Sequence, residues 1–97
     1  MISHTTERFR KLLAQLPKEI QKQAKKAYLQ FENDPYHPGL RFKRVHSTRP
    51  IYAIRISRDY RALGIQQNNE IIWFWIGSHS GYDKILKELK GCTRIRD

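Results

Sequence analysis

The residue best placed to do chemistry is a histidine that directly follows the most apolar stretch of the chain. His79 lies after residues 71–76 in a run of small residues, GSHSG at 77–81. Glycine permits close approach of the backbone to a ligand, and Tyr82 and Asp83 follow within one helical turn. We therefore expect the imidazole to be exposed at the end of a buried strand.

Two arginines on successive predicted strands could join this histidine. Arg55 and Arg61 alternate with apolar residues, and a hairpin between their strands would place both on one face of a sheet. Metal-free RNA cleavage needs a base for the 2′-hydroxyl proton, cations that stabilise the phosphorane and an acid for the leaving 5′-oxygen. His79, Arg55 and Arg61, with Tyr82 nearby, therefore predict a site suited to RNA cleavage.

Each of these residues also has a purely structural explanation. His79 could cap a helix or lie on the surface without a function. The two arginines could be solvated, or could pair with Asp59 and Glu70. Tyr82 could pack under a final helix, and Asp83 could cap it. The residue types and their spacing leave both explanations open.

The chain is strongly basic, and its charge is clustered. Its 97 residues include 19 Lys and Arg against 9 Asp and Glu, which gives a net charge of +10 and a pI of about 10.1. Segment 41–61 holds seven basic residues against Asp59 alone. Basic side chains release counterions when they meet phosphates, so we expect a polyanionic partner, either nucleic acid or an acidic protein. The lysines of residues 18–26 could contact phosphates or only solubilise a helix.

Several classes of protein are excluded by what the sequence lacks. The longest apolar run, residues 71–76, is far shorter than the roughly 18 to 20 residues of a membrane-spanning helix. Cys92 is the only cysteine, so an internal disulfide or a cysteine zinc site is impossible. There is no metal-ligand spacing, glycine-rich phosphate loop or Ser-His-Asp arrangement, and we expect neither a metal nor a cofactor. The N-terminal residues do not resemble a secretory signal, so a cytoplasmic location is expected.

The first third of the chain is predicted to be a helical hairpin, residues 1–33. Phe9, Leu12, Leu13 and Leu16 recur at helical spacing after a possible cap at Thr5 or Thr6. A proline at position 17 interrupts this pattern, and a second apolar stripe runs from residue 20 to residue 31. Turn-forming residues at 33–39 end the helical region.

The remainder is predicted to be a sheet over residues 40–77 and a short helix. A period of two marks four strands near 40–45, 52–56, 60–65 and 70–76, and their short connections favour antiparallel pairing. A helix over 79–90 and a polar tail over 91–97 follow. The predicted fold is a single α+β domain in the order α-α-β-β-β-β-α.

Two tryptophans in the last strand suggest a surface for a partner. Trp73 and Trp75 are two residues apart, so regular strand geometry would point them to the same face. Soluble monomers rarely expose so large an apolar patch. If the chain's own helices leave this face open, it is predicted to be a groove that binds a partner protein.

The sequence resembles the RelE/ParE superfamily, the toxins of bacterial type II toxin-antitoxin systems. The resemblance covers nearly the whole chain and is carried by residues 52–56 (YAIRI), 59–63 (DYRAL) and 72–83 (IWFWIGSHSGYD). It implies a helical hairpin packed on a twisted, mainly antiparallel sheet. It also implies a toxin that an acidic antitoxin neutralises in a hetero-oligomer, with Trp73 and Trp75 in the antitoxin interface.

For the activity, the resemblance implies a ribosome-dependent mRNA endoribonuclease, or mRNA interferase, which arrests translation. Arg61 matches a phosphate-binding arginine, Arg55 a cation near the scissile phosphate, and His79 a basic catalytic position, with Tyr82 as a base or sugar contact. The residues predicted to bind RNA beside these are Lys22, Lys25, Lys43, Arg44, His46 and Arg58. Ala53 departs from the pattern, because one subgroup has a second catalytic lysine there, and that subgroup's C-terminal tyrosine has no match.

Two other activities stay open. The same superfamily contains poisons of DNA gyrase that lack the ribonuclease residues, so fold alone does not settle the activity. The chain could also be an inactive member of the family. Such a member would only bind an antitoxin or serve as a DNA-binding repressor subunit. His79 together with two strand arginines favours the ribonuclease.

Overall fold

The computed structural model describes the backbone of residues 1–95 and the side chains of residues 1–89. The elements in chain order are β1 (Ile2–Thr5), α1 (Glu7–Ala14), α2 (Lys18–Asn33), a 3₁₀ turn η1 (Pro38–Leu40), β2 (Lys43–Arg44), β3 (Ile51–Ser57), β4 (Tyr60–Gln67), β5 (Glu70–Ser78) and α3 (His79–Ile95). None of the helices within residues 1–95 is long and apolar enough to cross a membrane.

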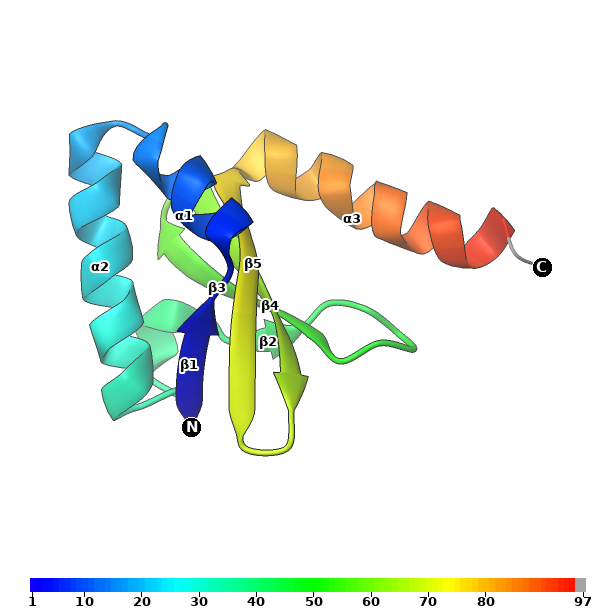
Figure 1. The fold of residues 1–97 in the computed structure, drawn as a ribbon, viewed down its shortest axis with the longest axis horizontal. Coiled ribbons are helices and arrows are strands. Elements are labelled where there is room, and N and C mark those ends of the chain that lie inside the picture. Colours follow the sequence, from blue (N-terminus) through cyan, green and yellow to red (C-terminus); the bar gives the residue numbers. More distant parts are fainter. Residues whose placement is uncertain (96–97) are drawn as a thin grey trace.

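The sheet has five strands rather than the four that the sequence predicts. Its order is β1-β5-β4-β3-β2, with β1 parallel to β5 and all other neighbours antiparallel. The added strand lies beside β5 in Figure 1, at the N-terminal end of the chain. Ile2 in this strand is 54% exposed, so β1 has no buried apolar face that a period of two could reveal.

The helical hairpin is confirmed, although it begins at Glu7 instead of at the N-terminus. Thr6 caps α1, because its hydroxyl accepts a hydrogen bond from the Phe9 N–H at 3.1 Å. Ala24, Ala27 and Phe31 are the buried residues of α2. In Figure 1, α1 and α2 pack against the sheet while α3 leaves the end of β5 on another side.

Helices pack on both faces of the sheet, and each face has its own core. The hairpin-side core contains Phe9, Ala24, Ala27, Phe31, Leu40, Ile54, Ala62, Ile71, Trp73 and Ile76. The α3-side core is smaller and contains Ile51, Ala53, Leu63, Trp75 and Tyr82. The last strand is therefore covered on both faces, as its continuous apolar sequence predicts.

The two tryptophans of β5 lie on opposite faces, so the prediction of a shared face is wrong. Leu63 pairs with Trp75 and Gly64 pairs with Trp73, which leaves Phe74 as an extra residue opposite no partner. Such a β-bulge reverses the alternation of side chains. Trp73 is 1% exposed and Trp75 is 9% exposed. The chain's own residues bury both, so the exposed antitoxin groove predicted at these tryptophans does not exist.

Two predicted elements have different lengths in the structure. The first strand, expected over 40–45, is only Lys43–Arg44, because Leu40 ends the 3₁₀ turn and Arg41 adopts a left-handed conformation with φ 49°. The last helix, expected to end at residue 90, continues to Ile95. The end of the predicted tail, residues 96–97, lies outside the described residues.

Candidate functional site

The β3–β4 hairpin places the two predicted arginines directly opposite each other. Arg55 pairs with Arg61 across the strands, two residues beyond the pair formed by Ala53 and Leu63. Ala53 and Leu63 belong to the α3-side core, so side-chain alternation puts both arginines on that face. This confirms that the two arginines share a face. It also shows that the α3-side face becomes strongly basic at one end.

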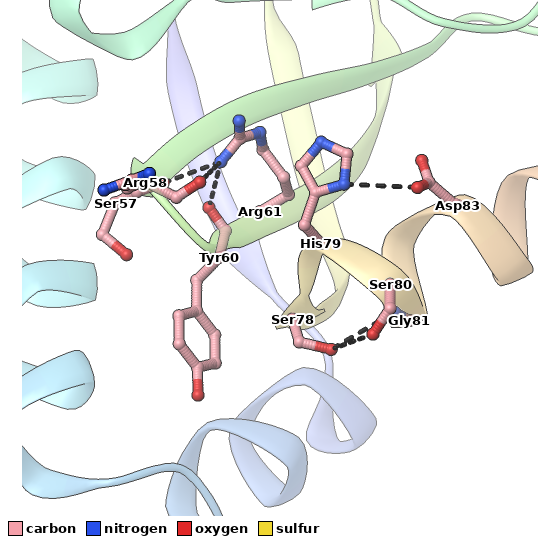
Figure 2. Close-up of polar contacts among 9 residues, drawn as sticks. All are labelled: Ser57, Arg58, Tyr60, Arg61, Ser78, His79, Ser80, Gly81 and Asp83. Atoms are coloured by element: carbon pink, nitrogen blue, oxygen red, sulfur yellow. Dashed lines mark hydrogen bonds and ion pairs between the residues drawn. The ribbon is translucent and has the colours of Figure 1, made fainter.

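The Arg61 side chain is fixed by the turn that precedes its strand. Its Nη1 donates to the backbone carbonyls of Ser57 at 2.7 Å, Tyr60 at 2.9 Å and Arg58 at 3.2 Å. Figure 2 shows these three contacts on one nitrogen, with the rest of the guanidinium directed away from them. Burial and then the neighbouring Arg55 lower the pKa of Arg61. A guanidinium remains charged despite such a shift, so Arg61 presents a fixed positive charge.

His79 is the first residue of α3 and joins the helix to the β3–β4 turn. Its backbone N–H donates to the carbonyl of Asp59 at 2.7 Å. Its ring Nδ1 lies 3.2 Å from Oδ2 of Asp83, one helical turn later, and the histidine side chain is 48% exposed. A carboxylate beside Nδ1 favours a proton on that nitrogen, which leaves Nε2 to accept one. In Figure 2 the second ring nitrogen lies on the side of the ring nearer to Arg61.

The glycines around His79 serve the packing of Trp75 rather than the approach of a ligand. Gly77 lies within β5, one residue before its end, and Gly81 lies in the first turn of α3, so the predicted loop is absent here. A Cβ added to Gly77 would lie 2.6 Å from Cζ2 of Trp75, and one on Gly81 would lie 3.3 Å from it. The absence of a side chain at Gly77 and Gly81 thus leaves room for the Trp75 ring where β5 passes into α3.

The predicted catalytic residues line one small cavity. It has a volume of about 90 Å³, and its polar lining consists of Arg41, Lys43, Arg55, Arg61, His79 and Tyr82. None of the described residues that line it is acidic. A small hollow with this charge suits a phosphate group. The juxtaposition of His79, Arg55 and Arg61 that the sequence predicts is therefore present, while their catalytic roles stay predictions.

Tyr82 belongs both to the α3-side core and to the cavity. Its side chain is 7% exposed, and its ring contacts that of His79 edge-on with centroids 5.6 Å apart. Burial raises the pKa of the Tyr82 hydroxyl, Arg61 opposes this shift, and Asp83 adds to it. The hydroxyl is therefore protonated at neutral pH and can donate a hydrogen bond.

Arg41 is a site residue that sequence reasoning did not single out. It lines the cavity beside Lys43 and follows the 3₁₀ turn in a left-handed conformation. Non-glycine residues adopt such a conformation at a cost that often marks functional segments. The only sequence signal for Arg41 is its place in the basic segment 41–61.

His46, predicted to contact RNA, is a buried structural residue. It is 3% exposed, and its Nδ1 accepts hydrogen bonds from the backbone N–H groups of Thr48 at 3.2 Å and Arg49 at 3.0 Å. The ring thus holds the turn before β3 in place. The prediction that this imidazole contacts RNA is therefore wrong, because His46 has almost no solvent-accessible surface.

The other predicted RNA-binding residues are exposed, but they lie on different elements. Lys43 lines the cavity. Arg44 and Arg58 are exposed on β2 and on the β3–β4 turn. Lys22 and Lys25 are exposed on α2 and line a separate groove beside α1. The structure thus brings one of these residues, Lys43, into the catalytic cavity.

The residues that the structure describes include no cluster of side chains that could bind a metal ion. No three His, Cys, Asp or Glu residues among them lie close enough together to hold a metal ion. The cations and the imidazole of the cavity instead suit an anionic ligand directly.

One protein family and several solved structures resemble this chain. The family described as a ParE-like toxin domain matches residues 18–84, which is more than half of the chain. A comparison with curated protein sequences finds no match.

Among solved structures, a chain of the RelB–RelE antitoxin–toxin complex from Methanococcus jannaschii has a TM-score of 0.69 and 23% identity, over 84% of this chain and 96% of that chain. YafQ from E. coli has a TM-score of 0.68 and 10% identity, over 82% and 94%. A YoeB/ParE toxin from Agrobacterium tumefaciens has a TM-score of 0.65 and 8% identity, over 81% and 99%. At these identities the likeness establishes the RelE-like α+β fold.

Proposed function

The chain belongs to the ParE-like toxin domain family of the RelE/ParE superfamily, and on this premise we propose that this toxin is a ribosome-dependent mRNA endoribonuclease. The observation that carries the proposal is the cavity in which His79 meets the cross-strand pair of Arg55 and Arg61. Like charges directly opposite each other in a sheet are destabilising. A phosphate bound between them would relieve this repulsion.

The reaction that fits these residues is an internal transfer of the phosphate. His79 removes the proton of the 2′-hydroxyl through Nε2, and the 2′-oxygen forms a bond to the adjacent phosphorus. Arg55 and Arg61 stabilise the additional negative charge of the phosphorane. The bond from phosphorus to the 5′-oxygen then breaks, and the leaving oxygen takes a proton from water. The products are a 2′,3′-cyclic phosphate and a 5′-hydroxyl end.

The partners follow from the charge. A protein of net charge +10 would bind ribosomal RNA and mRNA through exposed basic residues, with Lys43, Arg44 and Arg58 near the site and Lys22 and Lys25 on α2. Such binding weakens steeply as salt rises. An acidic antitoxin that covers the same basic surface would form the neutralised complex, and the toxin would act in the cytoplasm, where ribosomes are.

A second candidate is a non-nucleolytic poison of DNA gyrase. The description of the matching family as ParE-like favours it, because the superfamily includes gyrase poisons of this fold. Such a protein would keep the fold and the charge without depending on His79. A third candidate, an inactive antitoxin-binding member, would be harmless when expressed alone.

One pair of variants separates these candidates. His79→Ala should lower single-turnover cleavage of mRNA on purified ribosomes by about 10²- to 10⁴-fold, the usual contribution of one acid-base group. His4→Ala is the matched control, because His4 also lies beside a carboxylate, 2.9 Å from Glu70, and its side chain is 51% exposed. We expect His4→Ala to cleave at the wild-type rate.

Expression in bacteria gives the second measurement. The wild type should stop translation at once, without the DNA-damage response and filamentation that gyrase poisoning produces. A toxin that stays fully toxic after His79→Ala would contradict the ribonuclease and favour the gyrase poison. An intact chain that neither cleaves mRNA nor inhibits growth would favour the inactive member.

A further inference from the structure

The carboxylate of Asp83 pairs with a histidine in a chain that is rich in lysine and arginine. Its Oδ2 lies 3.2 Å from Nδ1 of His79, four residues earlier on α3. Among the described residues, this imidazole is the only ion-pair partner of Asp83. The chain contains 19 Lys and Arg, so cationic side chains that would attract a carboxylate more strongly are plentiful. The choice of an imidazole therefore needs a reason.

Two structural roles account poorly for this contact. An acidic residue in the first turn of a helix stabilises the positive end of the helix dipole, but Asp83 lies beyond the first turn of α3, which contains no acidic residue. An exposed ion pair contributes little to the stability of a fold, and the side chains of His79 and Asp83 are 48% and 60% exposed. The contact is better explained by its effect on the imidazole.

The His79 ring has neighbours on two sides. The Tyr82 ring meets it edge-on with centroids 5.6 Å apart. The Asp83 carboxylate can accept a hydrogen bond from an Nδ1–H group, so the neutral ring carries its proton on that atom and Nε2 is left to accept one. In Figure 2 the second ring nitrogen lies away from Asp83 and nearer to Arg61. The two neighbours together thus fix both the tautomer and the direction of the ring.

The charge of the cavity gives the carboxylate a second effect. When Nε2 takes the proton of the 2′-hydroxyl, the ring becomes an imidazolium, which nearby positive charges disfavour. A carboxylate on Nδ1–H stabilises the imidazolium while remaining deprotonated itself. Asp83 does not line the cavity, so its negative charge does not meet the phosphate. The cations that line the cavity with His79 are Arg41, Lys43, Arg55 and Arg61.

We propose that Asp83 is a positioning residue that acts only through His79. It fixes the proton of the neutral ring on Nδ1 and directs Nε2 toward the cavity. The kinetic consequence of this inference rests on the proposed ribonuclease activity. The tautomer itself can be measured without any cleavage, so the two can fail separately.

The kinetic test compares variants of Asp83 in single-turnover cleavage of mRNA on purified ribosomes. Asp83→Asn should cleave about tenfold more slowly, because a tautomer that is no longer selected leaves a smaller competent fraction of the enzyme. Asp83→Glu keeps the carboxylate and should restore most of the rate. The double variant His79→Ala/Asp83→Asn should be no slower than His79→Ala alone, because a residue that acts only through another has no separate effect.

Glu70→Gln is the matched control. It removes the carboxylate beside another exposed imidazole, that of His4, whose Nε2 lies 2.9 Å from Oε1 of Glu70, and it lies at the opposite end of β5 from His79. We expect cleavage at the wild-type rate. Thermal unfolding shows whether each variant is folded, and Asp83→Asn should melt close to the wild type. A folded Asp83→Asn protein with the wild-type rate would overturn the inference, as would an equal loss in the His79→Ala background.

The tautomer is read from two-bond ¹H–¹⁵N correlation spectra of the histidine rings, recorded about two pH units above the ordinary imidazole pKa of roughly 6.5. His79→Ala identifies the resonances of His79. We expect its proton on Nδ1 in the wild type and in Asp83→Glu, and a mixture of both tautomers in Asp83→Asn. His4 contacts its carboxylate through Nε2, so its ring should carry the proton on Nε2 in all three proteins.

The two measurements separate the inference from the ribonuclease. A wild type whose His79 proton lies on Nε2 would overturn the inference and leave the ribonuclease standing. A wild type that cleaves nothing but has the proton on Nδ1 would contradict the ribonuclease and retain the positioning of the ring by Asp83.

Discussion

The two faces of the sheet are made by the same strands but are completed differently. On the hairpin side, α1 and α2 cover a continuous core that extends from Phe9 and Phe31 to Trp73 and Ile76. On the other side, α3 covers a smaller core around Trp75 and Tyr82. Beyond this core the same rows of side chains continue into Arg55 and Arg61. The candidate site therefore lies at the end of the α3-side face that α3 does not cover.

This difference indicates a division between stability and function. The hairpin-side face contains the larger apolar cluster and thus supplies most of the hydrophobic contribution to folding. The α3-side face retains a pair of like charges that gains nothing for folding. Sites of this kind commonly trade stability for activity. Each of the three predictions below tests one part of that division.

The largest effect is expected from the hairpin-side core. Trp73→Ala should lower the free energy of unfolding by about 3–5 kcal/mol, the usual cost of removing a buried aromatic side chain. Denaturant titration followed by circular dichroism measures the change. Phe74→Ala is the control, because Phe74 is only partly buried and packs against the α3-side core. A greater loss for Phe74→Ala would contradict the division between the faces.

The two tryptophans also show what the sequence could predict of the fold and what it could not. Helical spacing and the period of two predict the hairpin and the antiparallel strands, because these patterns reflect local geometry. The residue types around Phe74 give no sign of the β-bulge there. The sequence therefore does not indicate that Trp73 and Trp75 point to opposite faces. The strand β1 was missed because its parallel pairing with β5 joins segments far apart in the chain.

The candidate site follows the same rule. Arg55 and Arg61 were predicted to meet because one short hairpin joins their strands, and the structure pairs them directly. Arg41 reaches the cavity only through the turn before β2, whose left-handed backbone no pattern indicates. His46 was assigned to RNA because it is a polar residue in a basic segment, and sequence does not report that its ring is buried.

The second prediction concerns the cross-strand arginines. Arg55→Gln removes the charge opposite Arg61, so we expect the free energy of unfolding to rise by about 0.5 kcal/mol at low salt. The gain should shrink as salt rises, because salt screens the repulsion. Cleavage should fall by about 10²-fold, on the scale of one lost group that stabilises transition-state charge.

The control for this variant is Arg8→Gln, which removes one positive charge from an exposed position on α1. It should change neither the stability nor the cleavage rate appreciably. If Arg55→Gln destabilises the protein at low salt, the pair does not repel in the folded state. The face would then not trade stability for function at this position.

The third prediction concerns two tyrosines, one on each face, under alkaline conditions. Tyr28 lies on the hairpin side, where burial and then Glu32 raise its pKa, although its hydroxyl donates to the Ser3 carbonyl at 3.1 Å. Burial likewise raises the pKa of Tyr82. An unfolded tyrosine titrates near pH 10. Above about that pH the unfolded chain loses these protons first, so the stability falls as the pH rises toward the folded pKa values.

Phenylalanine variants separate the contributions of the two faces. Tyr82→Phe should make the loss of melting temperature between about pH 9 and pH 11 smaller than in the wild type, because the unfolded state no longer gains from releasing that proton. Tyr28→Phe should show the same flattening together with a loss of about 1 kcal/mol at every pH, because the hydrogen bond to Ser3 is gone. Differential scanning calorimetry across this pH range measures both. A Tyr82→Phe curve parallel to that of the wild type would mean that the hydroxyl is not desolvated. The α3-side face would then be open to solvent even at its core.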